Sequence, residues 1–198
     1  MGLGIFGGSF DPVHNGHLFV AEAVREACNL SRVLFVPARH GRHRAAPLSA
    51  PAARSDMLRL AIAANTSFAF DDSDLTDDAT GYTADLLPRL AARYPGEELT
   101  FIVGGDSLVR SRWDRLDAVL DRLSAFVIAP RGDVTQTELD AALAELTPHR
   151  RAKVRFIDLP LVAESATLIR ARLAERRSVR YLVPEPVFRY IDDNELYQ

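Results

Sequence analysis

Residues 2–22 read GLGIFGGSFDPVHNGHLFVAE and join the first expected strand to the first expected helix. Leu3–Phe6 is a short apolar run of the kind that forms a buried strand. The glycines behind it predict a loop from Gly7 through Pro12. His14 to His17 then occupy the positions where a helix is expected to begin, so the stretch predicts a strand, a loop and a helix in direct succession.

The same stretch matches the pattern G-x-G-x-x-G from Gly2 to Gly7. In dinucleotide-binding proteins this pattern follows a strand and opens a helix. Here Leu3–Phe6 inside the pattern is itself the strand candidate, and no strand is expected before it. The acidic residue expected about 20 positions later would fall within 21–26, which we expect to be helical. We therefore interpret the match as accidental.

Short apolar runs alternate with helical stretches along the whole chain. Nearly continuous apolar runs, typical of strands buried on both faces of a parallel sheet, predict strands at Leu3–Phe6, Arg32–Val36, Phe68–Phe70, Thr100–Val103, Ala125–Ile128 and Val154–Ile157. Helices are expected at His17–Cys28, Ala52–Ala64, Thr83–Arg93, Glu138–Leu146, Thr167–Arg176 and Pro186–Asp192. Ser49 and Thr137 are expected near helix starts as caps. The alternation predicts one α/β domain over residues 1–198, a doubly wound Rossmann-like parallel sheet with helices on both faces.

Ligands of such sheets bind at the carboxyl ends of the strands, which directs attention to the loop after Leu3–Phe6. Gly7 and Gly8 allow the backbone to approach a ligand closely. His14 and His17 are three residues apart at a helix start, where unpaired N–H groups and the helix dipole favour an anion such as phosphate. A helix cap or packed side chains would explain the histidines equally simply. A zinc pair is disfavoured, because helical zinc histidines are usually four apart with a glutamate.

Composition excludes several classes of protein. The chain has 198 residues, 47% of them hydrophobic, and a net charge of −3, which gives no electrostatic case for nucleic-acid or membrane binding. Cys28 is the single cysteine, and no signal peptide is apparent, so we expect a cytoplasmic protein without disulfides. Residues 38–47 are basic and residues 71–78 acidic; a solvated loop is the usual explanation of either run.

GGSFDPVHNGH, residues 7–17, resembles the signature of the nucleotidyltransferase superfamily, whose phosphate-binding motif is H-x-G-H. SATLIR, residues 165–170, resembles that superfamily's second motif, I-S-S-T-x-I-R. Alone, the second stretch reads as an ordinary helix cap. The resemblance implies that ATP is bound by Gly7, Gly8, Ser9, Phe10, His14, Gly16, His17, Gly104, Asp106, Ser165, Thr167, Ile169 and Arg170.

Within the superfamily the chain is most similar to the bacterial nicotinate mononucleotide adenylyltransferases. VPARHGRHR, GYTADLL, FIVGGDSL and the final LVPEPVFRYIDDNELY look like segments of that family. The resemblance implies that the acceptor is bound by His43, Arg44, Tyr82, Thr83, Trp113 and Arg131. From the residues alone, Asp106 is either a ribose ligand or a helix cap. Trp113 is either a core residue or, in its polar neighbourhood, a stacking platform for a flat ring.

The implied reaction transfers AMP from ATP to nicotinate mononucleotide, giving deamido-NAD and pyrophosphate, a step of NAD biosynthesis. His14, His17 and Arg170 would be the catalytic residues, Mg²⁺ would arrive with ATP, and no protein metal site is expected. ATP and nicotinate mononucleotide would be the partners, with neither nucleic acid nor membrane, and the sequence leaves open whether the chain forms a homo-oligomer. The rivals are another adenylyl- or cytidylyltransferase, such as one acting on phosphopantetheine, and a sensor that binds ATP without turnover.

Overall fold

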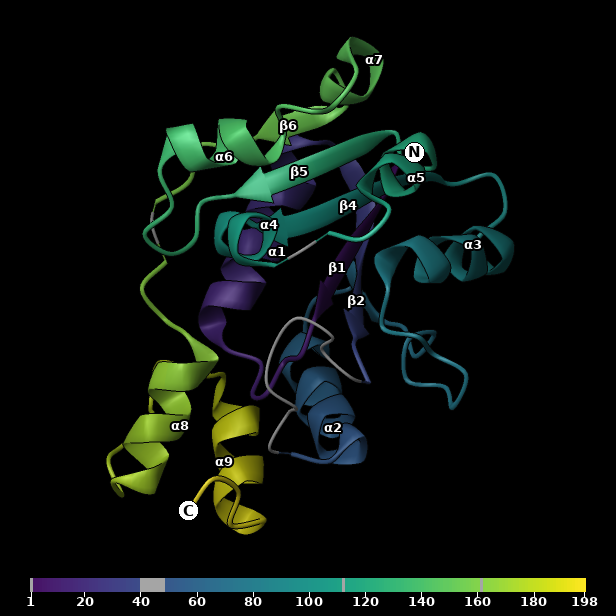
Figure 1. Ribbon diagram of the computed structural model, residues 1–198. Helices are drawn as coiled ribbons and strands as arrows, with labels where there is room; N and C mark the ends of the chain where they lie inside the picture. Colours follow the sequence, from purple (N-terminus) through teal and green to yellow (C-terminus); the bar gives the residue numbers. More distant parts are fainter. Residues whose placement is uncertain (1, 40–48, 112, 161) are drawn as a thin grey trace.

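Six parallel strands form one sheet at the centre of the computed structural model, in the order β3-β2-β1-β4-β5-β6 (Figure 1). The structure describes residues 2–39, 49–111, 113–160 and 162–198. The strands are β1 Gly2–Gly8, β2 Leu30–Pro37, β3 Phe68–Phe70, β4 Glu98–Gly104, β5 Ala125–Ala129 and β6 Val154–Phe156. Both the predicted strands and the doubly wound order are confirmed.

Side chains alternate between two buried faces along the central strands. Leu3 and Ile5 of β1 belong to one hydrophobic cluster, whereas Phe6 belongs to the cluster on the opposite face. In β2, Phe35 packs on the Phe6 side and Leu34 on the side of Leu3. Because both faces are covered, these strands read as continuous apolar runs in the sequence.

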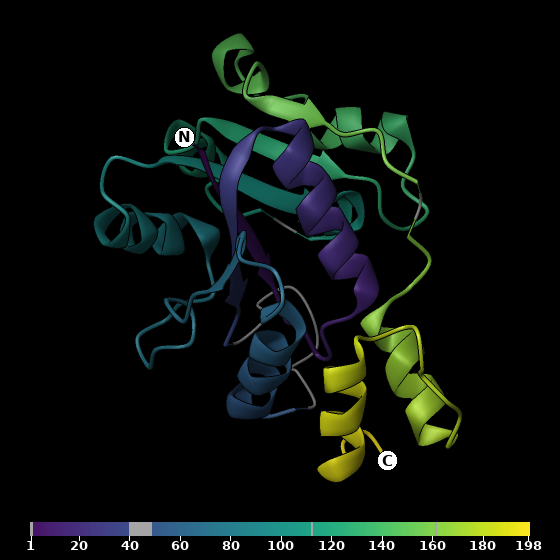
Figure 2. The same ribbon diagram turned by 180° about the vertical axis from the view of Figure 1, so that it is seen from behind.

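Helices cover both faces of the sheet. α1 lies across one face, where α2 and α9 also contribute to the core, while α3, α4 and α5 lie on the other (Figures 1 and 2). The bounds are α1 Asn15–Ala27, α2 Pro51–Ile62, α3 Thr83–Arg93, α4 Gly105–Arg110, α5 Leu116–Asp121, α6 Gln136–Ala142, α7 Pro148–Arg151, α8 Ala166–Ala174 and α9 Glu185–Asp193. None of the helices in the described ranges combines the length and the apolar character needed to cross a bilayer.

The predicted helices are all present, and the G-x-G-x-x-G match lies inside β1, as expected of an accident. Three short helices, α4, α5 and α7, were not predicted, because four to six residues are too few to reveal a helical period. Two cap predictions were wrong. Ala50 precedes α2 in place of Ser49, and Thr135 caps α6 with Glu138 at the third helical position, so Thr137 lies inside the helix.

The strand order creates a switch point between β1 and β4. The chain leaves β1 through α1 on one face to reach β2, and leaves β4 through α4 and α5 on the other face to reach β5. The connections diverge at the carboxyl ends of β1 and β4, which is where open α/β sheets bind their ligands.

A buried cation ties the loops at this edge together. The side chain of Arg54, on α2, is 0% exposed, and its guanidinium donates to four main-chain carbonyl oxygens. Nη1 bonds Ser9 and Ala38, at 2.8 Å each, while Nε bonds Ser49 at 3.3 Å and Nη2 bonds Arg39 at 3.4 Å. One side chain therefore joins the loops after β1 and β2 to the start of α2.

Replacing Arg54 by methionine should lower the free energy of unfolding by about 3 kcal/mol, because buried carbonyl oxygens lose their donor. Arg59→Met on the same helix is the control, since the Arg59 side chain is 54% exposed, and its effect should stay below about 1 kcal/mol. Urea unfolding followed by circular dichroism measures both. Equal losses for the two variants would contradict the role given to Arg54.

Candidate active site

The loop after β1 is built around a buried aromatic ring. Phe10 has φ of 48°, in the left-handed region, and its ring centroid lies 5.8 Å from that of Phe6 and 5.0 Å from that of His17. A side chain on Gly8 would bring its Cβ to 3.1 Å from the Phe10 ring. The strained Phe10 conformation is thus held by packing, and it places His17 at the start of α1.

His14 and His17 lie against each other at the beginning of α1. His14 is the N-cap, His17 the third helical residue, and their ring centroids are 3.7 Å apart at an interplanar angle of 31°. The His14 main-chain N–H donates to Nδ1 of His17 at 3.3 Å. Because Nδ1 accepts, the proton of a neutral His17 ring resides on Nε2. His17 can therefore cap the helix through Nδ1 and still offer its Nε2–H to a ligand.

His14 carries a buried imidazole. The residue is 2% exposed, and neither Nδ1 nor Nε2 of its ring has a hydrogen-bond partner among the described residues. Burial, reinforced by the positive charge of Arg131, lowers the pKa of His14 from 6.5 to about 3. The ring is therefore neutral at pH 7 and can donate one N–H and accept at the other nitrogen.

These histidines open onto a cavity of about 350 Å³ with its open mouth included, named here the histidine pocket. Its lining comes from the ends of β1, β4 and β5, the start of α1 and the segment before α8: Phe6, His14, Gly16, His17, Val20, Gly104, Ala129, Pro130, Arg131, Val162 and Glu164. A Cβ on Gly16 would lie 2.4 Å from Cγ1 of Val162 and 3.1 Å from Nδ1 of His14. Only glycine fits at this position without moving its neighbours.

Asp106 and Arg131 form a charged pair beside Gly104. Arg131 Nε lies 3.8 Å from Asp106 Oδ1. A Cβ on Gly104 would come within 2.7 Å of that oxygen and within 2.8 Å of Arg131 Cδ, so the glycine permits the pair to close over it. Asp106 is the second residue of α4, and Gly104 is the N-cap without any side-chain cap. The cap alternative for Asp106 is therefore wrong.

The second motif reaches the first through Arg170, on α8. Arg170 Nη1 donates to the main-chain carbonyl of Asp11 at 2.7 Å, and it lies 4.0 Å from the Asp11 carboxylate. Ser165 is the N-cap of α8 and accepts from the Leu168 N–H at 3.2 Å. The ordinary cap interpretation thus describes Ser165. The side chain of Ile169 is buried in the core, so only its backbone is available to a ligand.

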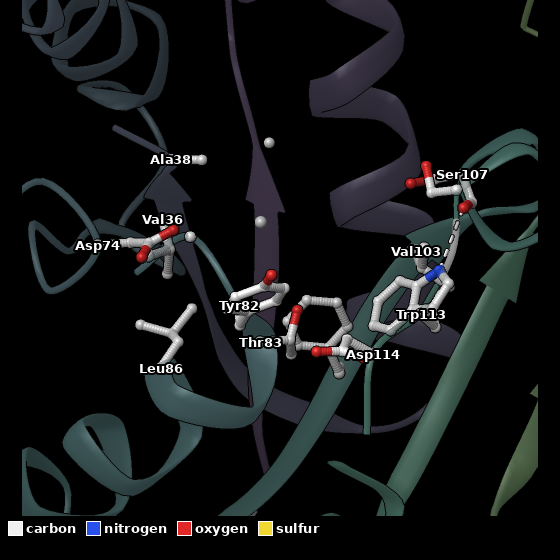
Figure 3. A pocket seen from close by; sticks show the side chains of 15 residues that line it. Val36, Ala38, Asp74, Tyr82, Thr83, Leu86, Val103, Ser107, Trp113 and Asp114 are labelled. Carbon is white, nitrogen blue, oxygen red and sulfur yellow. Dashed lines mark hydrogen bonds between the residues drawn. The ribbon is translucent and has the colours of Figure 1, made fainter. Parts of the chain in front are cut away.

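A second and larger cavity, about 710 Å³ with its open mouth included, lies on the other side of β1 (Figure 3). We name it the tryptophan pocket. The ends of β1, β2 and β4, the start of α3 and the segment after α4 line it: Gly7, Gly8, Val36, Ala38, Asp74, Gly81, Tyr82, Thr83, Leu86, Phe101, Val103, Ser107, Ser111, Trp113 and Asp114.

Trp113 is a half-buried wall of this pocket. Its indole N–H donates to the Ser107 carbonyl at 3.1 Å (Figure 3). Its ring packs edge to face on Phe101 and Phe126, with centroids 5.9 Å and 5.3 Å away. Trp113 is therefore a core residue, as one of the two interpretations expected, and it also lines the tryptophan pocket. Stacking on a ligand stays a prediction.

The start of α3 faces Trp113 across the pocket (Figure 3). Tyr82 is the N-cap and Thr83 the first helical residue. Thr80 Oγ1 accepts from the Tyr82 N–H at 3.3 Å and donates to Asp85 at 2.6 Å, which orders the turn. The first N–H groups of a helix have no acceptor within it, so this end of α3 presents donors and partial positive charge.

The acidic run 71–78 is not a simple solvated loop, contrary to expectation. Asp71 is fully buried, where it accepts from the Ser73 N–H at 2.8 Å and from the Tyr94 hydroxyl at 2.7 Å. Asp74 is also buried and lines the tryptophan pocket beside Val36 (Figure 3). Burial raises the pKa of Asp74 to about 6, and the charge of Arg89 offsets only part of that rise.

The structure places some of the predicted site residues in each pocket and others in neither. His14, Gly16, His17 and Gly104 line one, and Tyr82, Thr83 and Trp113 the other. Arg131, grouped by resemblance with the acceptor residues, lines the histidine pocket; Gly7 and Gly8, grouped with the ATP residues, line the tryptophan pocket. Seven predicted ATP residues line neither pocket: Ser9, Phe10, Asp106, Ser165, Thr167, Ile169 and Arg170. His43 and Arg44 lie outside the described residues.

Sequence reasoning missed Arg54, Asp11 and Tyr197, which brace the loop after β1. Arg54 shares the buried stripe of α2 with Met57 and Leu58, three and four residues on. A charged residue on an apolar stripe was the available signal. Asp11 and Tyr197 carry no comparable signal, because their contact joins opposite ends of the chain.

Comparison with known proteins identifies the family. The model of the cytidylyltransferase-like family matches residues 5–172. Two relatives bear the name "Probable nicotinate-nucleotide adenylyltransferase". That of Symbiobacterium thermophilum is 38% identical over 200 residues, 98% of this chain and 94% of its own, and that of Thermomicrobium roseum is 39% identical over 198 residues, 99% and 91%.

The same fold occurs in the solved structure of Plasmodium falciparum nicotinic acid mononucleotide adenylyltransferase complexed with NaAD. It superposes with a TM-score of 0.78 at 19% identity, over 99% of this chain and 97% of that one. Since the family model and the relatives both cover most of the sequence, the chain belongs to the cytidylyltransferase-like family, among the nicotinate-nucleotide adenylyltransferases.

Proposed function

We propose that this chain, an adenylyltransferase by family, transfers AMP from ATP to nicotinate mononucleotide and releases deamido-NAD and pyrophosphate. The single observation that carries the proposal is the pair of pockets on opposite sides of the carboxyl end of β1. Phe6 borders one pocket, and Gly7 and Gly8 border the other. Two substrates bound there would approach each other over glycine backbone, where no side chain separates them.

ATP would occupy the histidine pocket. In the first turn of α1, the N–H groups of Asn15 and His17 bond the Leu182 and His14 carbonyls, so the Gly16 N–H and the positive end of the helix are what α1 offers to a phosphate. The His14 ring, whose nitrogens have no partner among the described residues, offers a further donor, and Arg131 supplies positive charge at the wall. Arg170, bonded to the same loop through the Asp11 carbonyl, would hold the outer phosphates. Asp106 and Gly104 would serve the adenosine half.

The acceptor would occupy the tryptophan pocket. Its carboxylate would meet the first-turn donors of α3, which begin at Thr83, and its pyridine ring would stack on Trp113. Two carboxyl groups, Asp74 and Asp114, also line the pocket. They would repel a carboxylate placed beside them, so the start of α3 is the electrostatically favourable end, and the ribose hydroxyls are better partners for the acidic side chains.

The chemistry requires no protein nucleophile. An oxygen of the acceptor's 5′-phosphate attacks the α-phosphorus of ATP, the bond from that phosphorus to the bridging oxygen of the β-phosphate breaks, and pyrophosphate leaves with the electron pair. His14, His17 and Arg170 would stabilise the charge that builds on the phosphates, so catalysis would be positioning and electrostatic stabilisation.

Mg²⁺ belongs to the proposal as part of the ATP co-substrate, where it neutralises phosphate charge. In the described ranges, no three His, Cys, Asp or Glu side chains lie together in a way that could hold a metal ion. The ion would accordingly be held by phosphate oxygens and water, and no step depends on a metal held by the protein.

Pyrophosphate release from ATP and Mg²⁺ with a panel of acceptors tests the function. Nicotinate mononucleotide, nicotinamide mononucleotide and phosphopantetheine are compared with a reaction lacking acceptor. We expect release with the first to exceed all others. Release only with phosphopantetheine would identify a different transferase, and ATP binding without release under any condition would identify a sensor.

The acid should be preferred to the amide by roughly tenfold to a hundredfold in kcat/KM, because an amide would point its own donors at the donors of α3 and leave one unsatisfied. Trp113→Ala should weaken the use of both mononucleotides and leave their ratio unchanged, since stacking does not distinguish acid from amide. Steady-state kinetics of both enzymes with both acceptors measures this. A wild-type preference for the amide would rule out the placement of the carboxylate at α3.

Two substitutions of His17 should separate its roles. Asparagine can accept from the His14 N–H as Nδ1 does, but it lacks a donor near Nε2; glutamine can reach the Nε2 position with an amide N–H. Asparagine should lower kcat on the order of a hundredfold with a smaller effect on the KM for ATP, and glutamine should retain more activity. A near-normal kcat for His17→Asn would remove the Nε2 donor from the mechanism.

His14 should make the ligand-free protein sensitive to acid. Its folded pKa of about 3 lies below the unfolded value of 6.5, so the unfolded chain takes up the proton first as the pH falls. The contribution of the neutral His14 ring to the free energy of unfolding is fully present above about pH 6.5. It falls as the pH decreases, by about 2 kcal/mol at pH 5. His14→Gln should abolish this loss, while His149→Gln at an exposed position controls for removal of an imidazole. Urea unfolding at pH 7.5 and 5 provides the comparison.

A further inference from the structure

We propose that Tyr197 is a positioning residue for ATP: its hydroxyl holds the Asp11 carboxylate, and Asp11 in turn holds Arg170 and the loop that leads to His14. The inference rests on the proposed function insofar as it places ATP phosphates at these groups. It concerns a residue that touches neither pocket and that acts through a contact between opposite ends of the sequence.

The contact is a charge-assisted hydrogen bond at a buried carboxylate. The Tyr197 hydroxyl donates to Asp11 Oδ1 at 2.7 Å, across 186 positions of sequence, and Asp11 is 3% exposed. The Ser49 main-chain N–H donates to the same oxygen at 3.2 Å. A carboxylate this deeply buried depends on such donors, and the loss of one costs more than the loss of an exposed bond.

Asp11 is the point at which the two sequence motifs meet. It lies three residues before His14, and its carbonyl accepts from Arg170 Nη1 at 2.7 Å. A shift of Asp11 would therefore displace the Arg170 guanidinium and the start of α1 together. Both are groups assigned to the ATP phosphates, whereas the tryptophan pocket contains neither.

Tyr197 is itself held in place by the chain around it. The backbone turns back after α9, with Glu195 and Tyr197 at φ of 50° and 66°, and the Leu196 N–H bonds the Ile191 carbonyl at 3.0 Å. Leu196 and Tyr197 pack against the core on the α1 face. Burial and the adjacent Asp11 charge raise the pKa of Tyr197 above its ordinary value, so the phenol remains a donor. α8 and α9 lie beside each other at this end of the molecule (Figures 1 and 2).

The chain provides a matched control on the neighbouring helix. The Tyr190 hydroxyl, on α9, donates to the Asp56 carboxylate on α2 at 3.2 Å. Tyr197→Phe and Tyr190→Phe each delete one tyrosine-to-carboxylate bond and keep the ring. Only the Tyr197 bond leads to the loop between β1 and α1. Any general loosening of the region around α2 and α9 is common to both variants.

The experiment measures the dissociation constant of ATP without acceptor, the KM of each substrate, kcat and the midpoint of thermal unfolding. Tyr197→Phe should raise the dissociation constant and KM for ATP about tenfold and leave the acceptor's KM unchanged. Tyr190→Phe should leave both within about twofold. In an Asp11→Ala background, Tyr197→Phe should add nothing further, because its effect is transmitted through that carboxylate.

The outcomes are separable from those of the proposed function, since ATP binding is measured without acceptor. Equal effects of the two tyrosine substitutions on ATP affinity, or a Tyr197→Phe effect on the unfolding midpoint alone, would overturn the inference. An additive effect in the Asp11→Ala background would overturn transmission through Asp11. A wild-type protein that binds ATP but makes no deamido-NAD refutes the function and leaves the tyrosine comparison valid.

Discussion

The guanidinium of Arg54 is the interaction on which the ligand-binding edge depends. It lies in the interior without an ion-pair partner at contact distance in the described chain, and main-chain oxygens surround it instead. A buried cation is tolerated only when its donors are satisfied. The backbone is therefore constrained to present the carbonyl groups of Ser9, Ala38, Arg39 and Ser49 to it. The edge is ordered by a polar centre, whereas the sheet beneath it is ordered by apolar packing.

The carboxyl end of β1 borders two different environments, one on each face of the sheet. Successive residues of β1 point to opposite faces, so Phe6 borders a pocket containing imidazoles and Gly7 borders one containing indole and carboxyl groups. Because side chains alternate between the two faces, the end of a single strand at a switch point can border two dissimilar ligand pockets. Because Gly7 and Gly8 have no side chains, the space between the two pockets is left open.

The sequence predicts the sheet and the larger helices well, because strands buried on both faces are read directly from apolar runs such as Ala125–Ile128. The histidine pair and Arg170 follow from a resemblance that locates motifs but not contacts. Pocket membership escaped prediction: Arg131 turned out to line the wall beside His14. Arg54 was missed although it shares the apolar stripe of α2, whereas Asp74 was missed because tertiary packing alone decides its burial. A charged side chain has no local sequence pattern that distinguishes a buried position from an exposed one in a loop.

The bond between Asp11 and Tyr197 has a consequence for the biogenesis of the protein. β1 and α1 are synthesised before the other described elements, yet the carboxylate between them takes one of its hydrogen bonds from a residue 186 positions later. Until that residue is synthesised, the Asp11 carboxylate lacks the bond from the tyrosine hydroxyl, and contacts of such sequence separation form late in folding. The nucleotide site would accordingly be among the last parts of the molecule to mature. Chains interrupted by premature termination would possess the sheet without a finished site.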